Sequence, residues 1–284
     1  MVKIKGVVFD IDGTLIDFIG MKRTAANHAA MAMIDTGLKM SLPEASRELF
    51  KTYMSVGIDS DTWLGEFLKK YHGNADEAMI IAGKIAYQKI REAFMDPYPR
   101  VVPTLLQLIK KGIKLAVLTD ASKLKALKRL HTMKLYHFFD VVITIDDVGY
   151  PKPHPEAFRK VLNELKLQPE EVLMVGDVPE RDILGAKNVG MRTAFAKYGA
   201  EDAKRVLVSE NINSSKEGVN ADRKTDGSGA DYEISEIVFA GALFSMVSLG
   251  VVSAVVGGRS SMASVEQRTQ ALYLAQEGIE ALRS

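Results

Sequence analysis

Five short apolar runs, separated by stretches with helical spacing, constrain the fold of residues 1–200 more than any other feature of this 284-residue chain. Each run is nearly all apolar and is followed by a polar turn, which is typical of strands that are buried on both faces. Single helical stretches between such strands predict βαβ units in a parallel sheet, where ligands bind at the carboxyl ends of the strands. The expected strands are 4–9, 114–118, 141–145, 172–175 and 192–196. The expected helices between them are 102–111, 123–133, 155–165 and 181–189.

The segment that follows the first expected strand has a different pattern. Residues 17–94 contain no strand-like run and are rich in Ala, Met, Leu, Glu and Lys. The pattern predicts an all-helical insert between the first and second strands of the sheet. The expected helices of this insert are 24–34, 43–53, 62–71 and 76–94.

Composition excludes several classes of protein. The chain has 37 Lys and Arg against 36 Asp and Glu, a formal charge of +1, which gives no support to nucleic-acid binding through bulk positive charge. It has no cysteine, which excludes disulfide scaffolds, cysteine nucleophiles and thiolate zinc sites. We therefore expect no nucleic-acid partner, and we look for chemistry among the carboxylates.

Two carboxylates stand directly after the first expected strand. Asp10 and Asp12 are two residues apart, so an extended backbone points them to the same side, and Gly13 allows the chain to turn sharply after them. Carboxylates at the end of a buried strand are costly unless they bind a cation or transfer protons. This pair is the first candidate for a functional site.

Further polar residues follow the other expected strands. Thr119 and Asp120 come after the second strand, and Lys152 lies in a proline-rich loop after the third. Asp177 ends the fourth strand, and Asp182 follows at the start of a helix. Carboxylates offer hard oxygen ligands to Mg²⁺, while an ammonium and a hydroxyl bind phosphate oxygens. Together with the first pair, these residues predict a site for magnesium and a phosphate group.

Four motifs containing these residues resemble those of a known superfamily. DIDGTL, VLTDAS, the lysine of GYPKPHPEAF, and GDVPERDILGAKNVGM are similar, in order and spacing, to the four motifs of the haloacid dehalogenase superfamily of hydrolases. The resemblance covers about residues 1–200. It implies a Mg²⁺-dependent phosphate-monoester hydrolase that acts on a small phosphorylated metabolite. The expected fold is α/β, a doubly wound parallel sheet with a Rossmann-like core and an all-helical cap inserted after the first strand.

The same resemblance implies a role for each candidate residue. Asp10 would be the nucleophile that forms an aspartyl-phosphate, and Asp12 would protonate the leaving alcohol and later activate water. Thr119 and Lys152 would bind the phosphoryl group, and we place Asp120 beside them as a phosphate-binding candidate.

The resemblance to this superfamily also implies a set of metal ligands. Asp10, Asp12 (through its backbone carbonyl), Asp177 and Asp182 form the expected Mg²⁺ site, with Asp182 acting in support of the others. The helical insert would be the cap that closes over this site.

Alternative activities remain open. A phosphomutase would use the same residues. A haloacid dehalogenase needs neither a metal nor an acid two residues after the nucleophile, so Asp12 and the pair Asp177 and Asp182 favour phosphate transfer. A third alternative is a non-catalytic structural protein associated with a membrane or a filament.

The C-terminal region has a separate pattern. Residues 237–258 are 22 residues without a charge, long enough to span a membrane as a helix. With Glu236, this stretch and the amphipathic stretch after it resemble the N-terminal helix of type IV pilin-like proteins, although they lie at the opposite end of the chain and Asp231-Tyr232 replaces the Gly-Phe junction. We expect a cytoplasmic catalytic domain tethered to a membrane or filament by this helix. A helix buried against the domain and a fusion of two unrelated pieces are the alternatives.

These patterns divide the chain into regions. The expected α/β core comprises two segments, and the helical cap lies between them. A polar linker and a C-terminal region, which begins with the last strand, follow the core. The boundaries are 1–16 and 95–200 for the core, 17–94 for the cap, 201–229 for the linker and 230–284 for the C-terminal region.

Overall fold

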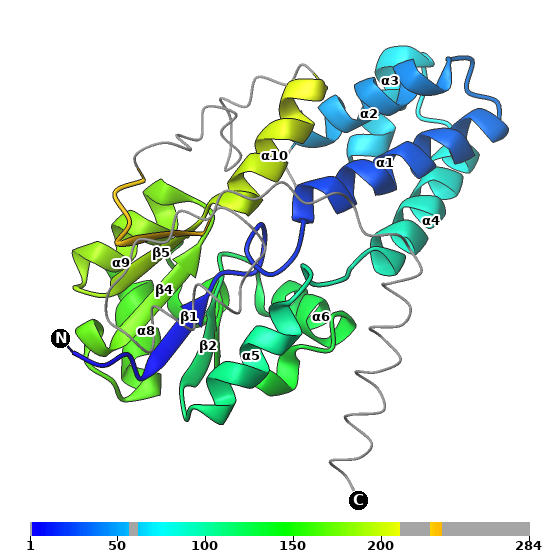
Figure 1. Ribbon diagram of the computed structural model, residues 1–284. Helices are drawn as coiled ribbons and strands as arrows, with labels where there is room; N and C mark the ends of the chain where they lie inside the picture. Colours follow the sequence, from blue (N-terminus) through cyan, green and yellow to red (C-terminus); the bar gives the residue numbers. More distant parts are fainter. Residues whose placement is uncertain (1, 57–61, 211–227, 235–284) are drawn as a thin grey trace, which may run out of the picture. The chain divides into compact units, whose positions relative to one another are not determined.

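The computed structural model describes residues 2–56, 62–210 and 228–234, and these residues form a parallel sheet with helices on both faces (Figure 1). Among the described residues the sheet has six strands in the order β3-β2-β1-β4-β5-β6, and all neighbouring strands are parallel. The α/β fold with a parallel sheet is therefore confirmed. The strands are β1 Gly6–Phe9, β2 Lys114–Leu118, β3 Val141–Ile143, β4 Val172–Gly176, β5 Arg192–Ala196 and β6 Tyr232–Ile234.

The register of the central strands explains where a site can form. Phe9, the last residue of β1, pairs with Val117 of β2 on one side and with Val175 of β4 on the other. The residues that follow these three strands therefore leave the sheet at the same edge. The residues that lie at this edge are Asp10, Thr119 and Asp177.

Alternate residues of the strands face two separate cores, as the period of a strand requires. Val7 packs in the core under α5, α6 and α10, whereas its neighbour Val8 packs in the core under α8 and α9. Both residues are fully buried, which accounts for the unbroken apolar runs in the sequence. The helices of this part are α5 Val101–Lys110, α6 Lys123–Thr132, α7 Ile145–Val148, α8 Pro155–Leu165, α9 Leu184–Asn188 and α10 Lys197–Ser209.

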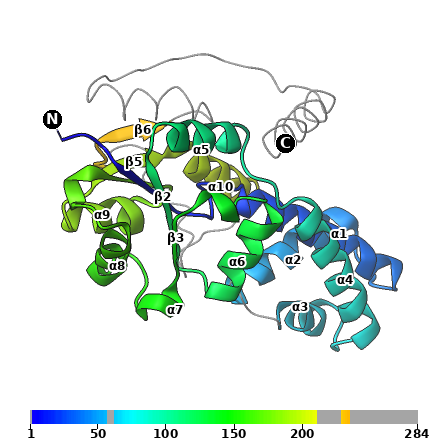
Figure 2. The same ribbon diagram turned by 90° about the horizontal axis from the view of Figure 1, so that it is seen from below.

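Among the described residues, the helices α1 to α4 form the insert between β1 and α5, and α1 packs against α2 and α4 (Figure 2). Their interior is aromatic: the ring of Trp63 lies 5.2 Å from that of Tyr53 and 5.1 Å from that of Tyr87. Asp17 begins α1 by accepting a hydrogen bond from the backbone N–H of Gly20. The helices are α1 Phe18–Asp35, α2 Leu42–Val56, α3 Trp63–Tyr71 and α4 Glu77–Ala93.

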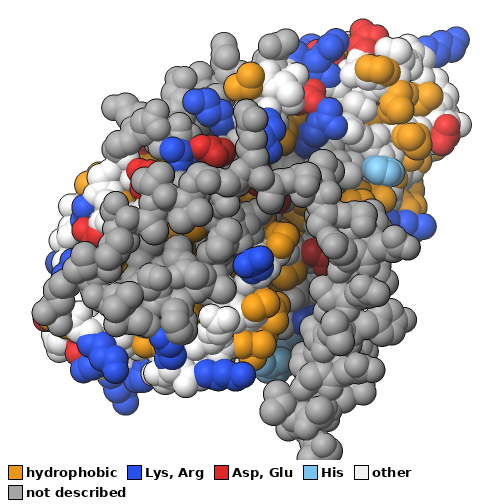
Figure 3. All heavy atoms as spheres, viewed as in Figure 1, with side chains coloured by type: hydrophobic (Ala, Val, Ile, Leu, Met, Phe, Trp, Pro, Cys, Tyr) orange, Lys and Arg blue, Asp and Glu red, His pale blue; other side chains and the backbone are white. Residues whose placement is uncertain are grey.

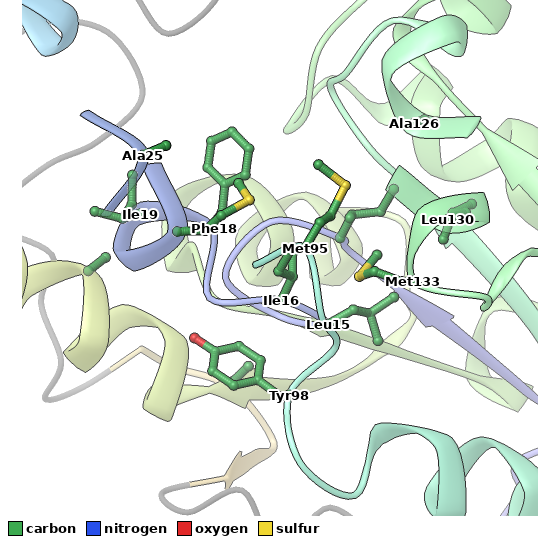
Figure 4. Close-up of a cluster of buried hydrophobic side chains, with 14 of the residues drawn as sticks. Leu15, Ile16, Phe18, Ile19, Ala25, Met95, Tyr98, Ala126, Leu130 and Met133 are labelled. Carbon is green, nitrogen blue, oxygen red and sulfur yellow. The ribbon is translucent and has the colours of Figure 1, made fainter. Parts of the chain in front are cut away.

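The segments that join this insert to the sheet share one apolar cluster (Figure 4). Leu15 and Ile16 from the first connection lie beside Met95 and Tyr98 from the second. The backbone N–H of Tyr98 donates to the carbonyl oxygen of Leu15 over 2.8 Å, which ties the two connections together. The loop after β1 is therefore held from the insert side as well as from the sheet.

Some apolar side chains remain on the surface. Hydrophobic side chains lie over the insert and over α5 on the face drawn in Figure 3. Ile81 and Ile85 of α4 are 57% and 49% exposed, and Leu106 and Ile109 of α5 are 42% and 43% exposed. The apolar faces of α4 and α5 are thus only partly covered by the described residues.

The structure differs from the sequence prediction after β5. Residues 201–229 were expected to form a linker, but α10 continues to Ser209, so the first part of that segment is helical. Ala203 and Leu207 are four residues apart and buried against the core, and this spacing explains the helix. Residues 211–227 lie outside the described residues. β6 then adds to the edge of the sheet, in agreement with the expected last strand at 230–234.

The hydrophobic stretch 237–258, expected to be a membrane or pilin-like helix, also lies outside the described residues. In the part of the chain that the structure describes, no helix combines the length and the hydropathy needed to cross a membrane.

Candidate active site

Lys152 lies at the centre of a buried cluster at the carboxyl edge of the sheet. Its ammonium donates to Oδ1 of Asp10 over 2.8 Å, to Oδ1 of Asp182 over 2.6 Å and to the carbonyl oxygen of Leu118 over 3.2 Å. Only 4% of Lys152 is exposed. A buried ammonium with three oxygen partners is fixed in place, and two of these partners are carboxylates predicted from the sequence to form the site.

Three carboxylates form the acidic side of this cluster. Asp10 follows β1, Asp177 follows β4, and Asp182 lies in the π-helical turn Pro179–Ile183. All three are buried, and one oxygen from each lies within 4.8 Å of the others. Carboxylate oxygens in such a group are the ligands that Mg²⁺ prefers, so the donor set fits this ion.

The two oxygens of Asp182 already have partners. Oδ1 accepts from Lys152, and Oδ2 accepts from the backbone N–H of Val178 over 3.0 Å. Asp182 therefore holds the lysine and the turn that follows β4.

Gly13 permits the close approach of Asp177 to the loop after β1. Its φ is +81°, which favours glycine, and a Cβ added there would overlap the carboxylate of Asp177. A side chain at this position would separate the two strand ends that supply the acidic cluster.

Burial dominates the electrostatics of the cluster. Burial raises the pKa of Asp10 to about 8; the nearby Lys152 opposes this shift, and Asp182, Asp177 and Asp12 add to it. Burial lowers the pKa of Lys152, but Asp10 and Asp182 outweigh this effect and raise it above the ordinary value. Lys152 therefore remains a cation at neutral pH, and burial makes Asp10 a weaker acid than an exposed aspartate.

Thr119 and Asp120 lie where β2 ends. Thr119 is 3% exposed, and its hydroxyl accepts a hydrogen bond from the backbone N–H of Ala121. One oxygen of Asp120 accepts from the backbone N–H of Lys152 over 2.8 Å, and the other lies 3.3 Å from the guanidinium of Arg181. Asp120 thus ties the lysine loop to the turn after β4.

The side chain of Asp12 is not part of the acidic group formed by Asp10, Asp177 and Asp182. Oδ2 of Asp12 lies 2.9 Å from Nη1 of Arg129, on α6. Asp12 thus differs from Asp10 in its cation partner, which is consistent with a different chemical task for each carboxylate.

Two functional candidates were missed from the sequence. Arg129 was not among the residues predicted from the sequence to form the site, but it is 7% exposed and lies beside Asp12. Arg181 lies inside the GDVPERD motif, directly before Asp182. Burial lowers the pKa of Arg181, and the surrounding carboxylates, Asp182 first, outweigh burial and raise it. The position of Arg181 within the motif was the only available signal, and for Arg129 there was none.

Comparison with known proteins identifies a matching family and several relatives. The family model of the haloacid dehalogenase-like hydrolases matches residues 4–190 of this sequence. The glyceraldehyde 3-phosphate phosphatase of Methanothermobacter thermautotrophicus is 34% identical over 208 residues, which are 73% of this chain and 92% of that protein. The pyrophosphatase PpaX of Bacillus thuringiensis is 33% identical over 202 residues, 69% of this chain and 84% of that protein.

Solved structures show the same fold. A phosphatase of this family from Thermococcus onnurineus has 28% identity and a TM-score of 0.50, over 82% of this chain and 94% of that chain. A putative β-phosphoglucomutase from Thermotoga maritima has 21% identity and a TM-score of 0.62, over 85% of this chain and 99% of that chain. The family model covers more than half of the chain, so the chain belongs to the haloacid dehalogenase-like hydrolases.

Proposed function

We propose that the protein hydrolyses phosphate monoesters of small metabolites, with Mg²⁺ as cofactor and an aspartyl-phosphate as intermediate. The observation that carries the proposal is the cluster in which Asp10 meets Lys152, Asp177 and Asp182 at the edge of the sheet. Matched relatives that are named as phosphatases of a small phosphorylated sugar support the choice of substrate class.

The proposed reaction has two steps. A carboxylate oxygen of Asp10 attacks phosphorus, the bond from phosphorus to the ester oxygen breaks, and Asp12 gives its proton to the leaving alcohol. Water then attacks the phosphorus of the aspartyl-phosphate and gives a proton to the Asp12 carboxylate, while the bond from phosphorus to the Asp10 oxygen breaks. This step releases inorganic phosphate and restores the Asp10 carboxylate and the Asp12 acid.

The remaining residues bind and orient the phosphoryl group. Lys152 neutralises phosphate charge, and the hydroxyl of Thr119 binds a phosphate oxygen. Asp10, Asp177 and the backbone carbonyl of Asp12 would hold Mg²⁺, and Asp182 would fix Lys152. Bound Mg²⁺ would supply positive charge that stabilises the oxygens of the transferring group.

The helical insert, residues 17–94, is proposed to act as a cap that excludes water from the site during the first step. Its first helix begins eight residues after Asp10, and its connections to the sheet share the apolar cluster around Leu15 and Tyr98. The proposal assigns no role to residues 237–258, which lie outside the described residues.

Hydrolysis of an aryl phosphate by the purified full chain tests the function. Asp10→Asn should lose at least about 10³-fold in turnover, because the amide is no nucleophile. Asp35→Asn, which changes an exposed carboxylate of the insert, is the matched control and should keep full activity. Undiminished turnover in Asp10→Asn would overturn the proposal.

Two further measurements separate the alternatives. A chelator should abolish turnover and added Mg²⁺ should restore it, whereas activity that ignores the chelator would favour a dehalogenase. Release of inorganic phosphate in molar balance with the alcohol indicates hydrolysis, whereas transfer of the phosphoryl group to a second hydroxyl of a sugar phosphate would indicate a mutase.

A further inference from the structure

A buried arginine lies beside the carboxylate that is proposed to transfer protons. Arg129 is on α6, and its guanidinium lies 2.9 Å from Oδ2 of Asp12. The side chain of Arg129 is 9% exposed, and that of Asp12 is 28% exposed. Removing an arginine from water is costly, and a carboxylate partner is the ordinary way to offset that cost.

The guanidinium has a second contact on the side of the insert. Its central carbon lies 4.7 Å from the centre of the ring of Phe18, the first residue of α1. Phe18 is itself buried, with 6% of its surface exposed. A cation over an aromatic face is stabilised by the charge distribution of the ring, and more strongly so when it is removed from water. The arginine is thus placed between the loop after β1 and the start of the insert.

We propose that Arg129 is a positioning residue that orients Asp12 for proton transfer to the leaving alcohol. The ion pair at Oδ2 draws the carboxyl group of Asp12 toward the guanidinium and so limits the positions that the carboxyl group can take. It also stabilises the carboxylate that is formed when Asp12 gives up its proton. This inference rests on the proposed function, because it acts through the acid step of that mechanism.

If Arg129 acts through Asp12, the effect of its loss on the rate of hydrolysis depends on the leaving group of the substrate. An aryl oxide with a low pKa leaves without a proton, so its departure does not need Asp12. An alkoxide is a poor leaving group and needs the proton in the transition state. Loss of Arg129 should therefore slow the hydrolysis of alkyl phosphates and leave that of activated aryl phosphates nearly unchanged.

The test compares kcat/KM for p-nitrophenyl phosphate and glycerol phosphate in three variants of the full chain. Arg129→Met should lower kcat/KM for glycerol phosphate by about 10²-fold, within the usual range for general acid catalysis, and for p-nitrophenyl phosphate by less than about threefold. Arg129→Lys keeps the charge and should recover part of the loss. Lys128→Met, which removes the exposed neighbouring ion pair with Glu92, should match the wild type on both substrates.

A double variant shows whether the arginine acts through Asp12. If it does, Arg129→Met added to Asp12→Asn should lower kcat/KM for glycerol phosphate little beyond Asp12→Asn alone. Full multiplication of the two losses would overturn the proposal.

Equal losses on both substrates would show that Arg129 serves only the structure, and no loss on either would also refute the proposal. Should Arg129→Met fail to fold, the same comparison is made with Arg129→Lys, whose loss must still be confined to glycerol phosphate. A wild-type protein that hydrolyses neither substrate would instead contradict the proposed function.

Discussion

Replacing Lys152 by methionine removes the cation on which the buried cluster depends. In the structure its ammonium lies 2.8 Å from Asp10 and 2.6 Å from Asp182, and Asp177 completes the acidic group. Methionine has a similar length and fills the space, so the loss of charge is the main change. The variant retains three buried carboxylates with no lysine beside them.

The expected cost can be taken from buried ion pairs. Removal of one partner of such a pair typically destabilises a protein by about 3–5 kcal/mol, because the other charge stays buried without compensation. Here the carboxylates can take up protons instead, and this makes the cost depend on pH. Burial raises the pKa of Asp10 from 3.8 to about 8, and Lys152 opposes that rise.

The sign of the pH dependence follows from this shift. A carboxyl whose pKa is higher in the folded than in the unfolded state binds more protons when folded, so folding becomes less favourable as the pH rises from about 4 to about 8. Without Lys152 the folded pKa rises further, so the loss of stability continues to a higher pH than in the wild type. The deficit of Lys152→Met should therefore grow as the pH rises from about 7 to about 9.

Urea unfolding in the presence of a chelator measures the effect. Lys152→Met should lose about 3–5 kcal/mol of unfolding free energy near pH 8, and Mg²⁺ should restore part of it. Lys160→Met is the control: its exposed pair with Glu164, at 3.1 Å, should contribute no more than about 0.5 kcal/mol. A loss below about 1 kcal/mol at every pH, or a deficit that shrinks as the pH rises, would refute the reasoning.

Three further predictions follow from other contacts. Burial raises the pKa of Asp17, so ionisation of this carboxyl opposes folding as the pH rises above 3.8. The variant Asp17→Asn keeps a side-chain oxygen that can accept from the backbone N–H of Gly20. It should therefore raise the melting temperature at pH 7 but not near pH 4. Because the pKa of Asp10 is about 8, binding of Mg²⁺ at pH 7 should release about one proton, and the affinity for Mg²⁺ should rise by up to about tenfold per pH unit between pH 6 and pH 7. Calorimetry in two buffers of different ionisation enthalpy measures the proton release, and its absence would contradict this prediction. A Cβ on Gly199 would overlap the carbonyl oxygen of Gly13, so Gly199→Ala should lower the free energy of unfolding by about 1–3 kcal/mol and should lower turnover. A variant that is more stable than the wild type would show that α10 does not pack tightly against the loop after β1.

Much of the sheet and its site could be predicted from the sequence because local patterns determine both. A strand buried on both faces must be apolar throughout, as β4 is, and parallel strands must end at one edge. Asp10 and Asp177 therefore lie close together because β1 and β4 are neighbours in the sheet, independently of the conformation of the loops. The described structure places both in the acidic group.

The contacts that the sequence did not reveal are long-range. Arg129 follows Lys125 and Lys128 on α6 and looks like part of a solvated face, yet Phe18 from another segment covers it. Its burial depends on how α1 packs, which no local pattern contains.

Local irregularity hid two other features. The helix expected at 181–189 begins instead as a π-helical turn, in which Asp182 accepts from the backbone N–H of Val178. The buried positions of α10 were obscured by the polar residues that follow Ser209.

The formation of a phosphoryl group on Asp10 is the central claim, and acid quenching during turnover of an aryl phosphate tests it most directly. Mass spectrometry of a peptic digest kept at acid pH, where an acyl phosphate survives, should find the phosphoryl group on Asp10. More of it should accumulate in Asp12→Asn, where the water step is slowed. A phosphoryl group on a different residue, or none in either protein while phosphate is being released, would contradict the account.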